Sequence, residues 1–161
     1  MSAKPLPPNW ESRLRFVRKS QENVEQRELS IPLSNGHEYI LFLRRNKLSP
    51  LDFSIGLVFK DSDGMEYLLR RHNGAHPSKH TNEYEKRKGL PNAKLPVCFH
   101  RHIATERYQT AGLRIDGYAE RANDYNDLQG AQDAMIHEAG FILPRDGGLQ
   151  YRMLDEEEEE N

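Results

Sequence analysis

The sequence has one cysteine, Cys98, and no long hydrophobic run. A lone cysteine excludes an internal disulfide, and this favours a reducing, cytoplasmic setting over an extracellular one. No stretch approaches the ~18 consecutive apolar residues that a membrane-spanning helix needs, so we expect no membrane partner. The segment Met1–Pro8 also lacks the apolar core of a secretory signal peptide.

Apolar residues are scarce for a globular protein. They make up 36% of the 161 residues, and the mean hydropathy is −0.88. A chain of this length most simply forms one domain, and its low apolar content indicates long loops or tails. We therefore expect a disordered, proline-rich segment over 1–8, a single α+β domain over 9–154 and a disordered tail over 155–161.

The charge is distributed unevenly along the chain. Six consecutive acidic residues, Asp155–Glu160, lie next to the C-terminal Asn161. Without these six, 19 acidic residues remain against 23 basic ones, so the rest of the chain carries a net charge of about +4. Runs of like charge are usually solvated and disordered, and an alternative is that this tail masks a basic surface of the body.

Alternating polar and apolar residues predict an antiparallel meander. Asn35-Gly36 separates the first two runs and Asp63-Gly64 the next two. Such dipeptides favour tight hairpin turns because they tolerate positive φ, so two successive hairpins are expected in one sheet. The four runs cover residues 28–33, 38–43, 51–59 and 65–71.

A fifth strand is expected over Val97–Ala104. Its alternation places His100 and His102 on the same face, as neighbours. The connection that leads to it, residues 73–95, is rich in Lys, Gly and Pro. A connection of this length within a small domain is usually either functional or disordered.

Two helices complete the predicted fold. Asn126 or Asp127 can cap a helix that ends before Gly140 and carries an apolar stripe. The spacing of apolar residues also predicts a short helix from Trp10 to about Lys19. The fold class is then α+β, with an antiparallel meander of about five strands packed on one C-terminal helix and a short N-terminal helix.

The main functional signal is a cluster of histidines. Histidine exchanges protons near neutral pH and is also a frequent metal ligand. Five of the seven histidines lie in the middle third of the chain, interleaved with arginines that can bind phosphate. They are His72, His76, His80, His100 and His102.

These residue types suit the cleavage of RNA without a metal. Such cleavage needs a base for the 2′-hydroxyl proton, an acid for the leaving oxygen and a cation for the charged phosphate. We assign His100 and His102 as the proton-transfer candidates, with His72 and His76 as alternates. We expect His100 and His102 to form one site with either His72 or His76. The phosphate-binding candidates are Arg70, Arg71, Arg101, Lys79 and Arg107.

Other interpretations stay open. The basic connection with Tyr84 suits a surface that binds nucleic-acid phosphates without chemistry. A non-enzymatic interaction or inhibitor module, antitoxin-like or from a phage, would use the acidic tail to mimic nucleic acid. A metal-dependent hydrolase would draw its ligands from His76, His80, His100 and His102, although Cys-x-x-Cys and His-Glu-x-x-His motifs are absent.

The order of several short motifs resembles that of known bacterial proteins. The motifs are Ile31-Pro32-Leu33, Leu68-Leu69-Arg70, Asn73-Gly74-Ala75-His76, His80-Thr81-Asn82, His100-Arg101-His102-Ile103 and Glu106-Arg107-Tyr108. Between residues 31 and 118 the chain thereby resembles a group of small, uncharacterised bacterial proteins with a His-x-His-Ile strand. It is also similar to toxins of the TumE type from two-gene toxin–antitoxin modules. The resemblance implies a bacterial or phage cytoplasmic protein, and it assigns no catalytic residue.

The leading hypothesis is a small cytoplasmic protein that engages nucleic acid, RNA rather than DNA. It would act as a toxin-like endoribonuclease through paired histidines, without a metal or other cofactor, and a cognate protein is a further expected partner. The interaction module and the metal-dependent hydrolase rank second and third.

We expect a chain that ends at Leu154 to keep the thermal stability of the whole protein. Seven residues with six like charges bury too little surface to offset the entropy lost when they become ordered. Thermal unfolding of both proteins at moderate salt checks this expectation. A clearly lower Tm for the shortened chain would contradict it.

Overall fold

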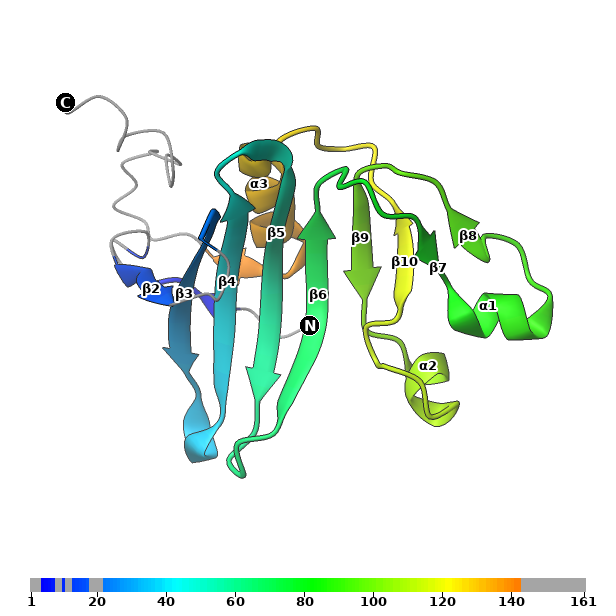
Figure 1. Cartoon of the computed structure of the whole chain (residues 1–161). Coiled ribbons are helices and arrows are strands. Elements are labelled where there is room, and N and C mark those ends of the chain that lie inside the picture. The colour runs from blue at the N-terminus through cyan, green and yellow to red at the C-terminus, as the bar shows by residue number, and fades with distance from the viewer. Residues whose placement is uncertain (1–3, 8–9, 11–12, 18–21, 143–161) are drawn as a thin grey trace.

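The computed structural model describes residues 4–7, 10, 13–17 and 22–142, and its main element is an antiparallel sheet of seven strands. The strands are β2 (Arg15–Val17), β3 (Val24–Pro32), β4 (Glu38–Asn46), β5 (Ser49–Lys60), β6 (Glu66–Asn73), β9 (His100–Ile103) and β10 (Tyr118–Arg121). Their spatial order is β10-β9-β6-β5-β4-β3-β2 (Figure 1). The fold is therefore α+β, as expected, but its sheet is larger than the predicted five strands.

Both predicted hairpins are confirmed. Asn35 and Gly36 have φ angles of 62° and 77°, as a type I′ turn requires, and they join the antiparallel pair β3 and β4. Gly64 has a φ of 85° in the turn between β5 and β6. There the Asp61 side chain accepts the backbone N–H groups of Asp63 and Met65, which stabilises the turn.

The long connection after β6 is ordered and leaves the sheet before returning to it. It forms β7 (His80–Thr81), α1 (Glu83–Lys88) and β8 (Lys94–Leu95), and β7 pairs with β8. A second short helix, α2 (Glu106–Thr110), connects β9 to β10. These elements lie at the β10 end of the sheet (Figure 1), and β6 pairs directly with β9 despite the insertion.

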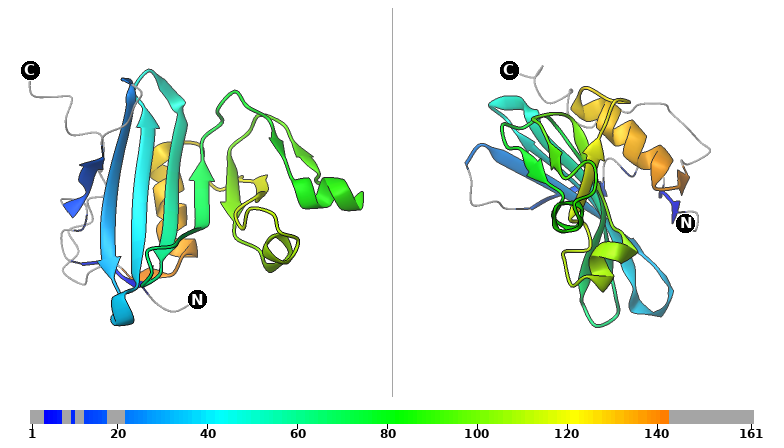
Figure 2. Two further views of the ribbon diagram at one scale, coloured as in Figure 1. Left: turned by 60° about the horizontal axis from the view of Figure 1, so that its bottom comes forward. Right: turned by 90° about the vertical axis from the view of Figure 1, so that its right-hand side faces the viewer.

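One face of the sheet is covered by α3 (Leu128–Glu138), as Figure 2 shows. The predicted cap is confirmed, because the Asp127 side chain accepts the N–H of Gly130 at 2.7 Å. Ala131 and Met135 on its apolar stripe are fully buried. The main core lies between this helix and the middle strands, where Leu43 and Ile55 contribute.

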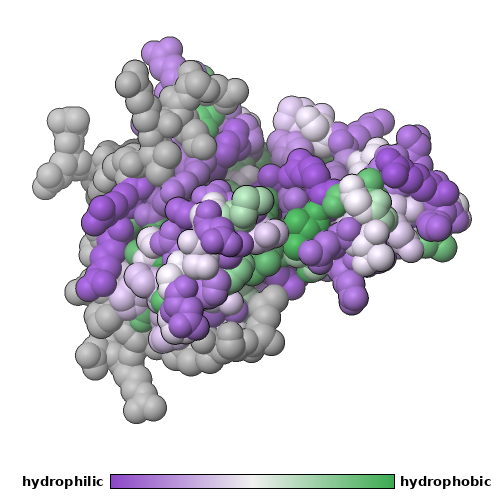
Figure 3. Space-filling view, turned by 90° about the horizontal axis from the view of Figure 1, so that it is seen from below, coloured by the Kyte–Doolittle hydropathy of each residue, from purple (hydrophilic) through white to green (hydrophobic). Residues whose placement is uncertain are grey.

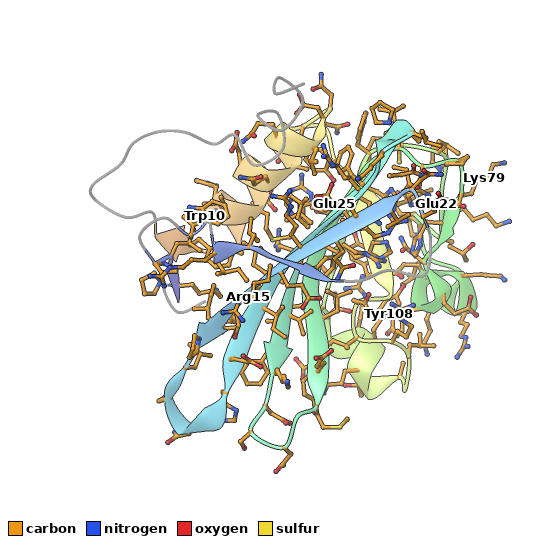
Figure 4. The ribbon with its side chains drawn as sticks, turned by 60° about the vertical axis from the view of Figure 1, so that its left-hand side comes forward. Trp10, Arg15, Glu22, Glu25, Lys79 and Tyr108 are labelled. Atoms are coloured by element: carbon orange, nitrogen blue, oxygen red, sulfur yellow. The ribbon has the colours of Figure 1, made fainter. Side chains whose placement is uncertain are left out.

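The predicted N-terminal helix is wrong. Arg15–Val17 instead forms the edge strand β2, which pairs with Gln26–Glu28 of β3. Trp10 is 2% exposed in the main core, near α3 in Figure 4. The apolar spacing therefore reflects a segment that docks on the core. A short helix is marginal on its own, and sheet hydrogen bonds here replace its internal ones.

Part of the segment that we expected to be disordered is also ordered. Lys4–Pro5 forms β1, which pairs in parallel with β11 (Phe141–Ile142), and Leu6 is buried in the main core. The acidic tail over 155–161 lies outside the described residues. No helix among residues that the structure describes is long and apolar enough to cross a membrane.

Gly74 directly follows β6, at a point where the backbone passes very close to β5. A Cβ atom at this position would lie 2.0 Å from the carbonyl oxygen of Leu51, a backbone atom that cannot move aside. The Gly74 N–H also donates to the carbonyl of Phe53 at 3.0 Å. Glycine here therefore allows the chain to turn away from the sheet toward His76.

We expect Gly74→Ala to lower the free energy of unfolding by roughly 1–3 kcal/mol, because the added methyl group overpacks a close backbone contact. Denaturant titration of the variant checks this. Ser78→Ala, at an exposed position in the same connection, is the matched control and should leave the free energy unchanged. Equal stability of Gly74→Ala and the parent protein would refute the close-approach argument.

Candidate functional site

The pairing of β6 with β9 brings four polar side chains together on the sheet face opposite α3. Arg71 lies directly across from His102, and Asn73 lies directly across from His100. All four line a pocket of about 390 Å³, which we call the histidine pocket. This volume falls within the range of small-ligand sites.

The rest of the histidine pocket comes from segments that lie outside the sheet. His76, Lys79 and His80 belong to the connection after β6, and Asp116 and Gly117 precede β10. The imidazole rings pack closely. The ring centroids are 5.0 Å apart for His76 and His100, 5.3 Å for His100 and His102, and 4.7 Å for His80 and His102.

His102 is held as a neutral ring with one nitrogen available. The acceptor at Nδ1 is the backbone carbonyl of Asp116, 3.0 Å away, so Nδ1 carries the proton. Nε2 has no hydrogen-bond partner among the described residues. Burial, assisted by the charge of Arg71, lowers the pKa of His102 to about 3. The geometry therefore leaves an Nε2 lone pair beside the arginine.

His100 is more fully constrained. Its Nδ1 donates to the carbonyl of Cys98 at 2.8 Å, and the Asn73 side-chain amide donates to its Nε2 at 3.2 Å. Asn73 is in turn oriented by Ser54, whose hydroxyl donates to the amide oxygen at 2.9 Å. Burial lowers the pKa of His100 as well. Because both ring nitrogens are occupied, His100 is better placed to support its neighbours than to transfer a proton.

His80 belongs to the same group, although we selected it from the sequence only as a candidate metal ligand and not as a catalytic residue. Its Nε2 lies 3.0 Å from two acceptors, the Gly117 carbonyl and the Asn82 side-chain oxygen, so Nε2 carries the proton. The Asn82 amide orientation is set by the N–H of Ala119, which donates to its oxygen at 2.8 Å. Only the fold of the insertion brings His80 beside His102.

His76 is half-buried, as His80 is, but unlike the other three rings it has no hydrogen bond among the described residues. Burial lowers its pKa, while the negative charge of Asp52 acts in the opposite direction. A histidine that is partly open to solvent and near a carboxylate can take up a proton more readily than a buried one. His76 is therefore better suited to carry a positive charge than the buried His100 and His102.

Arg71 has no ion pair or hydrogen-bond partner among the residues described by the structure, and its Nε is buried. Burial lowers its pKa, and the nearby charge of Asp116 partly opposes this effect. Asp116 itself is paired with Arg114 at 3.0 Å. An arginine without a carboxylate partner in a pocket is a typical binding group for a phosphate or another oxyanion.

The structure separates three of the other sequence-selected residues from this pocket. Arg70 and Arg101 point to the opposite face, where both form ion pairs with Glu138 of α3. His72 is fully buried on the same side and stacks on Tyr125, with ring centroids 5.6 Å apart. Their selection as phosphate-binding or catalytic residues is therefore not supported, and His76, not His72, joins His100 and His102.

A bulge explains why the alternation of residues in the sequence could not predict which arginine enters the pocket. Leu57 of β5 pairs with Arg70, but the next residue, Val58, pairs with Leu68, so Leu69 is an extra residue in β6. Leu69 packs against the main core on the α3 side. Simple alternation from Leu69 would place Arg71 under α3 and Arg70 in the pocket, and the bulge reverses this order.

The two remaining candidates differ in their relation to the histidine pocket. Lys79 is exposed at its rim and extends outward in Figure 4. Arg107 lies outside the pocket, where its Nε donates to Glu85 at 2.9 Å. No group of three or more His, Cys, Asp or Glu side chains in the described part of the chain is arranged to hold a metal ion.

The buried His72 predicts how stability depends on pH. Burial, with the charges of Arg101 and Arg70, lowers its pKa from 6.5 to about 4. Between these values the unfolded chain binds a proton that the folded protein does not bind. Stability should therefore fall from pH 7 to pH 5, by about 2 kcal/mol for this one residue.

His72→Phe keeps a ring against Tyr125 but cannot titrate, so its loss of stability from pH 7 to pH 5 should be smaller by about that amount. Denaturant unfolding at the two pH values measures the difference. His137→Ala, at an exposed position of α3, is the control and should lose as much stability as the parent protein. An unchanged pH dependence in His72→Phe would refute the assignment.

Comparisons with protein-family models, with curated proteins and with solved structures found no match to this chain. The resemblance noted from its short motifs therefore stays an expectation. The function has to be argued from the geometry and chemistry of the histidine pocket.

Proposed function

We propose that the protein binds a phosphodiester of RNA in the histidine pocket and cleaves it without a metal ion. The observation that carries this proposal is the position of Arg71 beside His102. The arginine has no carboxylate partner among the described residues, and the histidine presents an unprotonated Nε2 next to it. A cation and a base side by side are two of the three groups that this reaction needs.

Arg71 would hold the phosphate. A guanidinium donates several hydrogen bonds in one plane and matches two phosphate oxygens at once. In the structure its buried Nε lacks an acceptor, and burial lowers its pKa, so the charge is poorly compensated. A bound phosphate would supply acceptors for the Arg71 N–H groups. The hydrogen bonds formed in this way would contribute to the binding free energy.

His102 and His76 would transfer the protons. His102 Nε2 accepts the proton of the ribose 2′-hydroxyl, and the 2′-oxygen then attacks phosphorus. The bond from phosphorus to the 5′-oxygen breaks, and protonated His76 gives its proton to that oxygen. The products are a 2′,3′-cyclic phosphate and a 5′-hydroxyl end, so no water, metal or other reactant is consumed in the step.

The electrostatics of the pocket suit binding that is coupled to proton uptake. Burial and the charge of Arg71 lower the pKa values of His102 and His100. A phosphate anion next to the rings favours their protonated forms and so raises these pKa values toward neutrality. His76 is less buried than His100 and His102 and lies near Asp52, so it is expected to become charged before these two rings.

A toxin-like role is consistent with this chemistry. A small nuclease that needs no metal and attacks RNA is one way for a toxin of a two-gene module to act, and the motif order resembles the TumE type. The acidic tail, Asp155–Glu160, and a cognate protein are then candidates for controlling the pocket. A protein that binds RNA without cutting it would instead favour the alternative of a surface that binds nucleic-acid phosphates without chemistry.

The test is cleavage of a pool of single-stranded RNA oligonucleotides of varied sequence, with and without a chelator. We expect cyclic-phosphate products, equal rates with the chelator, and no cleavage of DNA of the same sequences because it lacks the 2′-hydroxyl. His102→Ala should lower the rate by about 10²- to 10⁴-fold. Arg71→Ala should weaken RNA binding by about 10- to 100-fold, the size of a charged hydrogen-bond contact.

His137→Ala and Arg121→Ala are the matched controls, because both residues are exposed and lie outside the histidine pocket. Circular dichroism checks that every variant is folded. Intact RNA after incubation with the parent protein, or full activity in His102→Ala, would overturn the cleavage mechanism. Activity that is lost to a chelator and restored by zinc would favour the metal-dependent hydrolase.

A further inference from the structure

We propose that the recess between α1 and α2 is a second subsite, which stacks one unpaired base of the strand whose phosphate occupies the histidine pocket. The inference rests on the proposed function for the identity of the ligand and extends it to the substrate class. The recess has a volume of about 500 Å³, and its wall includes Tyr84, Lys88, Glu106, Arg107 and Thr110.

The two sites are immediate neighbours. Glu83 lines the histidine pocket, and the next residue in the chain, Tyr84, lines the recess. The ring of Tyr108 also lines the histidine pocket, and its centroid is 5.8 Å from that of Tyr84. The first turn of α1 and one aromatic ring thus separate the sites, so adjacent parts of one nucleotide chain can reach both.

Two flat groups that line the recess, the Tyr84 ring and the Arg107 guanidinium, are held in place by groups behind them. The Arg107 guanidinium lies 4.5 Å from the Tyr118 ring centroid and 5.8 Å from the Tyr84 ring centroid. Glu85 fixes this arrangement, because it accepts the Arg107 Nε–H at 2.9 Å and the Tyr108 hydroxyl at 2.6 Å. A base that stacks here would not have to order these side chains first, which favours binding.

The surroundings attract a nucleic-acid backbone. Lys86, Arg87 and Lys88 of α1 are exposed beside the recess, and Lys79 is exposed at the rim of the histidine pocket. Glu83 offsets only Arg87, with which it forms an ion pair at 3.0 Å. Hydrophilic residues dominate this end of the molecule in Figure 3. Clustered cations of this kind bind phosphates without regard to sequence.

A base is the ligand that matches these features best. Aromatic rings and guanidinium planes stack on any base face, and the charged rim contacts the backbone. A base inside a duplex is stacked on its neighbours and cannot enter. The subsite therefore predicts a preference for single strands over double strands.

The test is binding to single-stranded DNA, which cannot undergo the proposed cleavage, measured by fluorescence anisotropy. We expect Tyr84→Ala to weaken binding by about 5- to 150-fold, the range reported by alanine substitution at stacking positions. Tyr84→Phe keeps the ring and should bind as the parent protein does. Oligonucleotides without bases, and duplexes of the same length, should bind Tyr84→Ala and the parent protein equally.

Tyr67→Ala, on β6 outside both sites, is the control for loss of a tyrosine and should leave binding unchanged. Equal binding of the base-containing strand by Tyr84→Ala and the parent protein would overturn the subsite, even if RNA cleavage is confirmed. A base-dependent loss in Tyr84→Ala without any RNA cleavage would support the subsite and refute the cleavage mechanism. Failure of the parent protein to bind single-stranded DNA would overturn the subsite, whereas the cleavage mechanism is overturned only by intact RNA in the cleavage assay.

Discussion

The candidate site depends on one strand pairing, that of β6 with β9. Arg71 faces His102 and Asn73 faces His100 across this ladder, so a cation, a hydrogen-bond donor and two imidazoles share one sheet face. Successive side chains of a strand point to opposite faces of the sheet. A shift of one residue in β6 or β9 would therefore turn its pocket side chains to the α3 face and its α3-facing side chains to the pocket. The bulge at Leu69 is part of the same constraint, because it determines which alternate residues of β6 face the pocket. The histidine pocket therefore depends on the register in which β6 pairs with β9.

The two faces of this strand pair use similar residues in opposite ways. Under α3, Arg70 and Arg101 share the carboxylate of Glu138, and their charges are compensated within the protein. Burial raises the pKa of Glu138, whereas the two arginines oppose that shift, as expected for a carboxylate removed from water next to cations. On the other face Arg71 has no such partner among the described residues. The first arrangement joins the helix to the sheet, and the second leaves a charge available for a ligand.

The insertion between β6 and β9 completes the pocket and is held to the sheet by a buried amide. Asn82 is fully buried, donates to the carbonyls of Asn92 and Ala119, and accepts the N–H of Ala119. The same side-chain oxygen receives the Nε2–H of His80. Each bond satisfies a polar group that would be costly to bury alone. Asn82 therefore connects β10, the insertion and the histidine pocket, and the recess between α1 and α2 depends on this attachment.

Local patterns in the sequence determined several features correctly. The turns at Asn35-Gly36 and Asp63-Gly64, the cap at Asp127 and the shared face of His100 and His102 all rest on interactions between residues close together in the chain. The short strands β2 and β10 were missed because three or four residues show too little alternation. Which arginine enters the pocket was decided only by the tertiary structure. Arg70 and Arg71 are adjacent and chemically identical, and their roles depend on a bulge, on the partner strand and on a carboxylate 68 residues away. Periodicity cannot supply such long-range contacts, since they form only when distant segments pack together.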